Sequence, residues 1–222
     1  MKLVVLGANG RTGRLVLEAA LEKGMDVTAV VRSTEKHPGM QHDRLSVVVG
    51  DACEPAFLKR VLRGQDAVIS ALGGRRPTKT ATSVYFRSAD AIVEAAWETG
   101  LKRVLVTSTA LLFREHTLMG DILRLCVPNV VRSATRMEKT LKASRLNWTS
   151  ARAGFLNDAD KDGYRAQRSA LPKDGTSVSR RALAHFLIDA IENPDTYGAA
   201  FGVSNAATYQ EQSKIPSHTP SS

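Results

Sequence analysis

The hydrophobic residues follow two alternating patterns along the chain. Compact apolar runs rich in Val, Leu and Ile are typical of strands buried on both faces of a sheet, and they occur at residues 2–6, 27–31, 45–49, 67–71 and 103–107. Between them, apolar residues recur at helical spacing over residues 11–23, 56–62, 82–98 and 135–144. Residues 148–152 and 199–203 are typical of further strands, with a helix at 181–191. This alternation predicts an α/β fold: a doubly wound parallel sheet with helices on both faces.

No linker divides the 222 residues, so we expect one domain over residues 1–205. Residues 206–222 are polar and contain two prolines, which indicates a C-terminal extension. No apolar run approaches the roughly 20 residues of a membrane span. The apolar N-terminal run turns polar after Leu6, too early for a signal peptide. We therefore expect a soluble, cytoplasmic protein without a membrane partner.

The formal net charge of +9 favours an anionic partner, either nucleic acid or a phosphate-rich cofactor. The basic residues are spread widely and few aromatic residues lie among them, so nucleic-acid binding is not the expected function. Cys53 and Cys126 are far apart, and the five histidines are equally scattered. Neither set has metal-ligand spacing, so we expect reduced thiols and no metal site.

The segment GANGRTG, residues 7–13, joins the first predicted strand to the first predicted helix. Gly7 permits a tight turn, Gly10 lets backbone N–H groups approach a pyrophosphate, and Gly13 lets the helix pack close to the strand. The helix N-terminus then favours the anion. This context predicts a Rossmann-like, NAD(P)-binding fold whose turn holds the cofactor through Gly7, Asn9, Gly10, Arg11, Thr12 and Gly13.

The end of the second predicted strand bears on the choice between NAD and NADP. An NAD site usually carries Asp or Glu there, about 20 residues after the glycines, whereas this chain has Arg32 followed by Ser33. An arginine can bind a 2′-phosphate through two hydrogen bonds, with Ser33, Lys36 and Arg11 as further donors. We therefore expect NADP(H), although Arg32 as a solvated loop residue is the alternative.

Two further strand ends carry candidate cofactor contacts. Asp51 and Ala52 follow the third strand, where the Asp51 carboxylate either accepts the adenine amino group or caps the next helix. Ala71 ends the fourth strand, beside the point where the strand order reverses and ligands bind. The candidates that follow it are Leu72, Gly73, Gly74 and Arg75.

The segments VVLGANGRTG, VVRS, VVGDA, GQDAVISALGGR, VLVTSTALLF, RMEKTLKASRLNW and SRRALAHFLIDAI, in this order, resemble the atypical short-chain dehydrogenase/reductase superfamily in its NmrA-like branch. The resemblance extends to about Ser204, and it is greatest to the NADPH-dependent flavin and biliverdin reductases of that branch. It implies hydride transfer from NADPH to a small-molecule acceptor of the flavin, quinone or tetrapyrrole type. It also implies a nicotinamide-end site that contains Ser108 and Thr109 as catalytic candidates and Thr107, Ala153 and Phe155 as cofactor contacts.

The chain departs from the Tyr-dependent relatives because it has no Tyr-x-x-x-Lys. Its four tyrosines are followed four residues later by Ala89, Arg168, Phe201 and Ser213. Ordinary carbonyl reduction, which needs a positioned proton donor, is thereby disfavoured, whereas flavin reduction needs mainly two rings held in contact. Glu138 and Phe155 replace histidines of the biliverdin reductases, which disfavours biliverdin itself.

Several roles stay open from the sequence. Phe155 either stacks on the acceptor or belongs to the core. The Ser108 and Thr109 hydroxyls either contact the nicotinamide carboxamide or the acceptor, or cap the next turn. Lys139 either touches the cofactor ribose or is solvated. For the whole chain, the alternative to a reductase is a non-catalytic NADP(H)-sensing regulatory protein.

Overall fold

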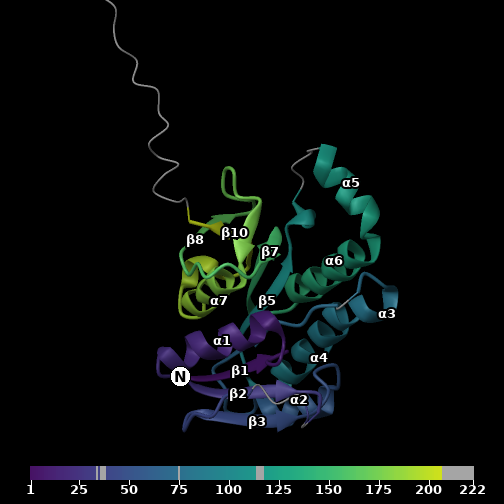
Figure 1. The fold of residues 1–222 in the computed structure, drawn as a ribbon. Coiled ribbons are helices and arrows are strands. Elements are labelled where there is room, and N and C mark those ends of the chain that lie inside the picture. Colours follow the sequence, from purple (N-terminus) through teal and green to yellow (C-terminus); the bar gives the residue numbers. More distant parts are fainter. Residues whose placement is uncertain (34, 36–38, 75, 114–117, 207–222) are drawn as a thin grey trace, which may run out of the picture.

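The computed structural model describes residues 1–33, 35, 39–74, 76–113 and 118–206. At its centre is an eight-stranded sheet of order β3-β2-β1-β4-β5-β6-β10-β8 (Figure 1). All neighbouring strands are parallel except β8, which runs antiparallel to β10 at the edge. The strands are β1 (Lys2–Leu6), β2 (Asp26–Val31), β3 (Leu45–Val49), β4 (Ala67–Ser70), β5 (Arg103–Thr109), β6 (Asn147–Ala153), β8 (Tyr164–Arg168) and β10 (Ala199–Asn205).

Helices cover both faces of the sheet, as the alternating pattern predicts. On one face α1 (Arg11–Glu22) packs beside α7 (Arg180–Asp189), over a core that includes Leu17 and Leu183. On the other face lie α2 (Pro55–Leu62), α4 (Val84–Thr99) and α6 (Pro128–Ala143). Their core includes Leu58, Ile92 and Leu141, all fully buried. The doubly wound α/β fold is therefore confirmed.

Most boundaries shift by one or two residues from the sequence expectation, and four differences bear on the site or on the helix ends. β5 extends two residues further, so that Ser108 and Thr109 end the strand instead of following it. The helix expected from residue 135 begins at Pro128, because proline suits the first helical position. The helix expected over residues 82–98 is divided at Ser83 into α3 (Lys79–Thr82) and α4. The carboxylate of Asp51 does not cap α2, whose N-cap residue is Glu54.

Besides the edge strand β8, five short elements among the described residues were not expected from the pattern. The helix α5 (Leu118–Cys126) precedes α6, and β7 (Phe155–Asn157) pairs in parallel with β9 (Ser177–Ser179) outside the main sheet. Two single-turn 3₁₀ helices cover Ala110–Leu112 and Pro194–Thr196. Of the expected polar extension, residues 207–222 lie outside the described residues. In the part of the chain that the structure describes, no helix has the length and apolar character needed to cross a bilayer.

The strand order places a binding crevice between β1 and β4. From β1 the chain winds outward through β2 and β3, and then crosses to β4 on the other side of β1 and continues through β5 and β6. Ligands of open α/β sheets bind outside the carboxyl ends of the strands where this reversal occurs. The segments that follow β1 and β4 are therefore the places to look for a site.

Candidate functional site

The glycine turn brings β1 and α1 into close contact. Gly7 has a positive φ of 77°, and its carbonyl accepts a hydrogen bond from Gly10 N at 2.8 Å. A Cβ atom at Gly13 would lie 2.1 Å from the Gly7 oxygen, a distance that no side chain tolerates. A Cβ at Gly7 would approach the Ala71 carbonyl to 3.1 Å, so the turn also packs against the end of β4. The structural reasons predicted for Gly7 and Gly13 therefore hold.

The N-terminus of α1 presents free donors at this turn. Gly10 is the N-cap residue and has no side chain, and the first turn contains no acidic residue. The first N–H groups of a helix lack intrahelical partners, so they and the helix dipole favour an anion. Arg11 is exposed beside them, and Thr12 is half-buried. Asn9 accepts a hydrogen bond from Arg14 Nη2 at 2.6 Å and is thereby held within the turn.

A second group of donors follows β2. Arg32 is exposed, and the Ser33 hydroxyl is buried without a hydrogen-bond partner among the described residues. A buried hydroxyl in this state is costly unless a partner arrives. Lys36, the third expected donor, lies outside the described residues. Among the described residues, the end of β2 thus combines an exposed cation with a hydroxyl that lacks a hydrogen-bond partner, which suits an anionic ligand.

Asp51 and Ala52 lie at the end of β3. Asp51 Oδ1 accepts a hydrogen bond from Cys53 N at 2.9 Å, and the rest of the carboxylate is exposed. Ala52 is buried. Burial, with the Asp51 carboxylate beside it, raises the pKa of Cys53 to about 11. The Cys53 thiol is therefore protonated at neutral pH and is no nucleophile.

The segment after β4 lies against α3 and α4. Leu72 is half-buried, Gly73 is exposed, and a Cβ at Gly74 would approach the Ala81 carbonyl to 3.0 Å. Tyr85 lies beneath these glycines: burial raises its pKa, while a hydrogen bond with the Gly74 backbone acts in the opposite direction. Arg75 lies outside the described residues.

The hydroxyls at the end of β5 have different partners. Thr109 Oγ1 accepts a hydrogen bond from Leu111 N at 3.3 Å, so it caps the 3₁₀ turn that follows. Thr107 Oγ1 donates to the Ser70 carbonyl at 3.5 Å. Ser108 Oγ instead donates to Glu138 Oε1 at 2.8 Å. The sequence left open whether these hydroxyls cap the next turn. Thr109 does so, whereas Ser108 belongs to a side-chain network.

Glu138 is the centre of that network, which sequence reasoning missed. Its carboxylate is nearly buried on α6 and accepts from Ser108 Oγ, from Ser150 Oγ at 2.7 Å, and from Arg152 Nε and Nη2 at 3.1 and 2.5 Å. The Arg152 guanidinium also lies 4.6 Å from the centre of the Phe113 ring. A carboxylate only accepts hydrogen bonds, so the Ser108 proton points at Glu138 and the Ser108 lone pairs face elsewhere.

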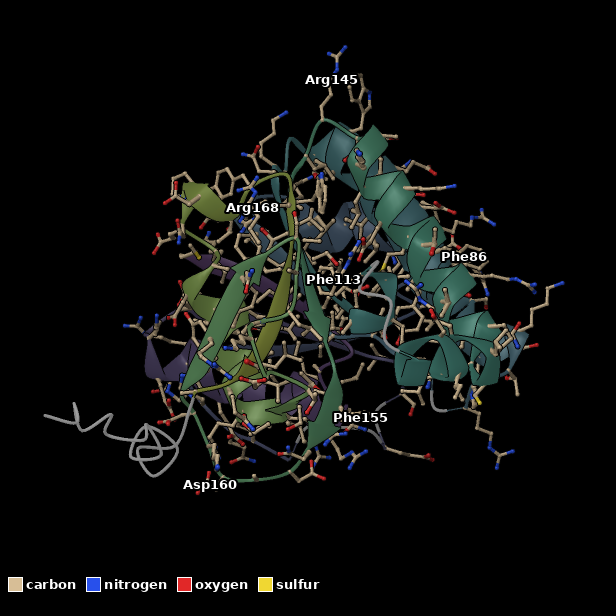
Figure 2. All side chains as sticks on the ribbon, turned by 90° about the horizontal axis from the view of Figure 1, so that it is seen from above. Phe86, Phe113, Arg145, Phe155, Asp160 and Arg168 are labelled. Carbon is tan, nitrogen blue, oxygen red and sulfur yellow. The ribbon has the colours of Figure 1, made fainter. Side chains whose placement is uncertain are left out.

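The remaining candidates follow β6. Ala153 is buried in the core beneath α1 and α7, so its side chain faces away from α6. Phe155 is 62% exposed, which excludes the core alternative for its ring. Figure 2 looks down from above and shows Phe155 at the rim of the molecule and Phe113 nearer its centre. Lys139 is exposed on α6.

Taken together, the ends of β1, β2 and β4 have the features of a dinucleotide site. The glycine turn leaves no room for side chains at Gly7 and Gly13, and the N-terminus of α1 supplies backbone donors. Next to Arg32, the buried Ser33 hydroxyl lacks a hydrogen-bond partner among the described residues. The chemistry of this donor set fits two phosphate positions, one at the turn and one beyond β2.

Comparison with known proteins agrees with this geometry. The Photosystem II assembly factor Ycf39 of Guillardia theta is 30% identical over 161 residues, which cover 70% of this chain and 47% of that protein. The chain spans less than half the length of the Ycf39 proteins that it matches. Among solved structures, the oxidoreductase ylbE of Lactococcus lactis has a TM-score of 0.79 at 19% identity, with complete coverage of both chains.

A short-chain dehydrogenase/reductase of Veillonella parvula, solved in complex with NADP, has a TM-score of 0.77 at 22% identity. That match covers 94% of this chain and 96% of the other, and it shows a shared fold. The NAD(P)H-binding family pattern matches residues 7–194, from the first glycine of the turn to the segment before β10. The chain belongs to the NAD(P)H-binding family, with the Rossmann-like fold of short-chain dehydrogenases/reductases.

Proposed function

We propose that the chain is an NADPH-dependent reductase that passes a hydride to a flat conjugated acceptor of the flavin or quinone class. The observation that carries this proposal is the exposed Phe155 ring just beyond β6, the strand paired with the one that ends in Ser108 and Thr109. An exposed ring offers a stacking surface for a planar acceptor. It lies on the carboxyl side of the sheet, where dinucleotides bind across the crevice of this fold.

The preference for NADPH rests on Arg32 and Ser33. A guanidinium and a hydroxyl at the end of β2 match a 2′-phosphate, whereas a ribose 2′-hydroxyl is usually bound by a carboxylate. In this proposal the turn residues Gly7 to Gly13 hold the pyrophosphate, and Asp51, Ala52 and Leu72 to Gly74 line the rest of the groove. Thr107 and Ala153 contribute at the nicotinamide end.

The choice of acceptor follows from proton supply. The nicotinamide, when bound, supplies the hydride. One proton must complete a two-electron reduction, and the sequence contains no Tyr-x-x-x-Lys to deliver it. The Ser108 proton is engaged by Glu138. A flavin or quinone takes the remaining proton from solvent, whereas a carbonyl needs a positioned donor. Tetrapyrroles rank behind these acceptors because Glu138 and Phe155 stand where the resembling biliverdin reductases carry histidines.

The Ser108–Glu138 pair supports a positioning role for Ser108. With its proton directed at Glu138, the hydroxyl offers lone pairs to an N–H group of the carboxamide or the acceptor. Such a contact orients a ring without transferring a proton. The rate gain in this proposal comes from holding two rings together.

The test follows NADPH absorbance with the purified chain against FMN, FAD, riboflavin, a soluble quinone and biliverdin. We expect turnover with at least one flavin or quinone, and faster turnover with NADPH than with NADH. Turnover with biliverdin alone, or with simple ketones, would contradict the proposed acceptor class.

A second candidate is a non-catalytic NADP(H)-binding regulator. The observation in its favour is the match to the Ycf39 proteins, which are named as assembly factors. This candidate predicts NADPH binding without oxidation by any acceptor of the panel. The same assay, run beside an NADPH titration, separates the two proposals.

A further inference from the structure

A cavity lies between α6 and the strands β6, β10 and β8, the last of which forms the edge of the sheet. It has a volume of about 660 Å³, within the range of small-molecule sites. Its lining includes Trp148 and Gly198, which lie at the amino ends of β6 and β10. The dinucleotide turn lies at the opposite, carboxyl ends of the strands, and none of its residues lines the cavity, which reaches the carboxyl end of β6 only at Arg152.

Small residues of β10 create this hollow. Gly198, Ala199 and Ala200 contribute to the lining and leave room above the sheet, while Trp148 and Leu112 add apolar surface. The lining runs along β6 from Trp148 to Arg152, a length of roughly 13 Å at the usual rise per residue. In Figure 2, Arg168, which lines one end of the hollow, and Phe155 lie in different parts of the molecule.

The lining is strongly basic. It contains four cationic side chains and a single carboxylate, that of Glu138. Glu138 is already paired with Arg152 and also accepts hydrogen bonds from Ser108 and Ser150. The other three cations are Lys139, Lys142 and Arg168. They leave an uncompensated charge of three around one hollow.

These three cations have no acidic partner within the described part of the chain. Lys139 and Lys142 are exposed, and they lie three residues apart on the same face of α6. Arg168 donates to the carbonyls of Asp195 at 2.7 Å and Tyr197 at 3.4 Å, which fixes its guanidinium at the rim. Gathering like charges is unfavourable unless an anion offsets their repulsion.

We propose that this hollow binds a small organic anion with two or more negative charges, of the polycarboxylate or phosphate-ester class. Lys139, Lys142 and Arg168 bind the charged groups, and Trp148 and Leu112 contact the carbon skeleton. The hollow binds its ligand with the dinucleotide groove already filled.

The test is calorimetric titration of the NADP⁺-loaded protein with citrate as the probe, at about 150 mM KCl so that distant charges are screened. The variant Lys139→Gln/Lys142→Gln removes two charges from the hollow. Its control, Lys102→Gln/Arg145→Gln, removes two exposed charges that do not line it; Arg145 lies beyond the end of α6 (Figure 2). We expect the first variant to weaken citrate binding about tenfold or more, while the control stays within about twofold of the parent.

A second variant tests shape without changing charge. Ala200→Leu fills the hollow from β10 and should also weaken citrate binding, with NADP⁺ affinity unchanged. Absence of citrate binding by the parent protein, or an equal loss in the lysine variant and its control, would overturn the proposal. The proposal would also be overturned if Ala200→Leu bound citrate as tightly as the parent protein does.

Discussion

Arg11, in the glycine turn, donates a hydrogen bond to Asp158 Oδ2 at 2.8 Å, across 147 residues of sequence. Asp158 follows β7, and its other oxygen accepts from Arg180 at the start of α7, at 2.7 Å. One carboxylate thus connects the glycine turn to the segment that carries Phe155. It also offsets the charge of Arg11 at the position where the proposed function places a pyrophosphate.

Replacing Asp158 with asparagine should tighten NADPH binding. Arg11 and Asp158 are 71% and 60% exposed, so the pair contributes less than about 1 kcal/mol to stability. The asparagine oxygen can still accept from Arg180, but it no longer neutralises Arg11. We expect a gain of about two- to fivefold in NADPH affinity at low salt, which fades as salt rises.

Asp160→Asn is the matched control. Asp160 lies two residues further on and pairs with Arg181 at 2.9 Å, without contacting Arg11. Its replacement should leave NADPH affinity unchanged. Weaker binding in Asp158→Asn, measured by fluorescence titration, would show that Asp158 positions Arg11 for the cofactor.

Arg32→Glu should weaken NADPH binding by about 2–4 kcal/mol, because a charge-assisted contact is replaced by repulsion of the 2′-phosphate. NADH lacks this phosphate, so its affinity should hardly change. Lys102→Glu makes the same charge change at the amino end of β5 and serves as the control. Equal affinity of the unmodified protein for NADPH and NADH would contradict the role of Arg32.

Substitutions at two glycines of the turn should have different effects, one on stability and the other on cofactor binding. In Gly13→Ala the new Cβ meets the Gly7 oxygen at 2.1 Å, so α1 must move away from β1, at a cost of about 1–3 kcal/mol or more in stability. A Cβ at Gly10 would lie 3.1 Å from the Gly7 oxygen, a tight contact that a small shift of this exposed residue relieves, so Gly10→Val should keep the fold and lose the cofactor. Thermal unfolding and NADPH titration of both variants check this. A stable Gly13→Ala that still binds NADPH would be incompatible with the close packing seen here.

The buried strands and the glycine turn could be predicted from the sequence because each depends on residues that are close together in the chain. The apolar runs specify the buried strands, and the glycine turn has its own backbone requirements. The sequence left a helix cap as one of two roles for Asp51, but Pro55 is the first helical residue and makes Glu54 the N-cap.

Features formed between distant segments left weaker signals. β8 has no apolar run, since it lies at the sheet edge and is defined by its pairing with β10. Glu138 lies 30 residues from Ser108 and 12 from Ser150, and tertiary packing alone brings them together. One clue existed: strand alternation places Ser150 and Arg152 on one buried face, which requires a polar partner from the facing helix.

The Glu138 network leads to the last prediction, which separates positioning from proton donation. Ser108→Ala removes a hydroxyl whose proton is directed at Glu138, so catalysis loses one orienting contact. We expect kcat/KM for flavin reduction to fall on the order of tenfold, about 1.4 kcal/mol, as for a single hydrogen bond. A proton donor would cost about 10²–10⁴-fold.

Ser150→Ala is the internal control for this prediction. Ser150 donates to the same Glu138 oxygen, but it is fully buried and cannot touch the acceptor. Its loss should lower the unfolding temperature while kcat/KM stays within about threefold of the parent, because Ser108 and Arg152 still hold the carboxylate. Thr109→Ala, which removes a turn cap, should likewise cost stability more than rate. If Ser108→Ala lost a thousandfold in rate, and the loss varied steeply with pH between about 5.5 and 9, Ser108 would be a proton donor and solvent would not supply the proton.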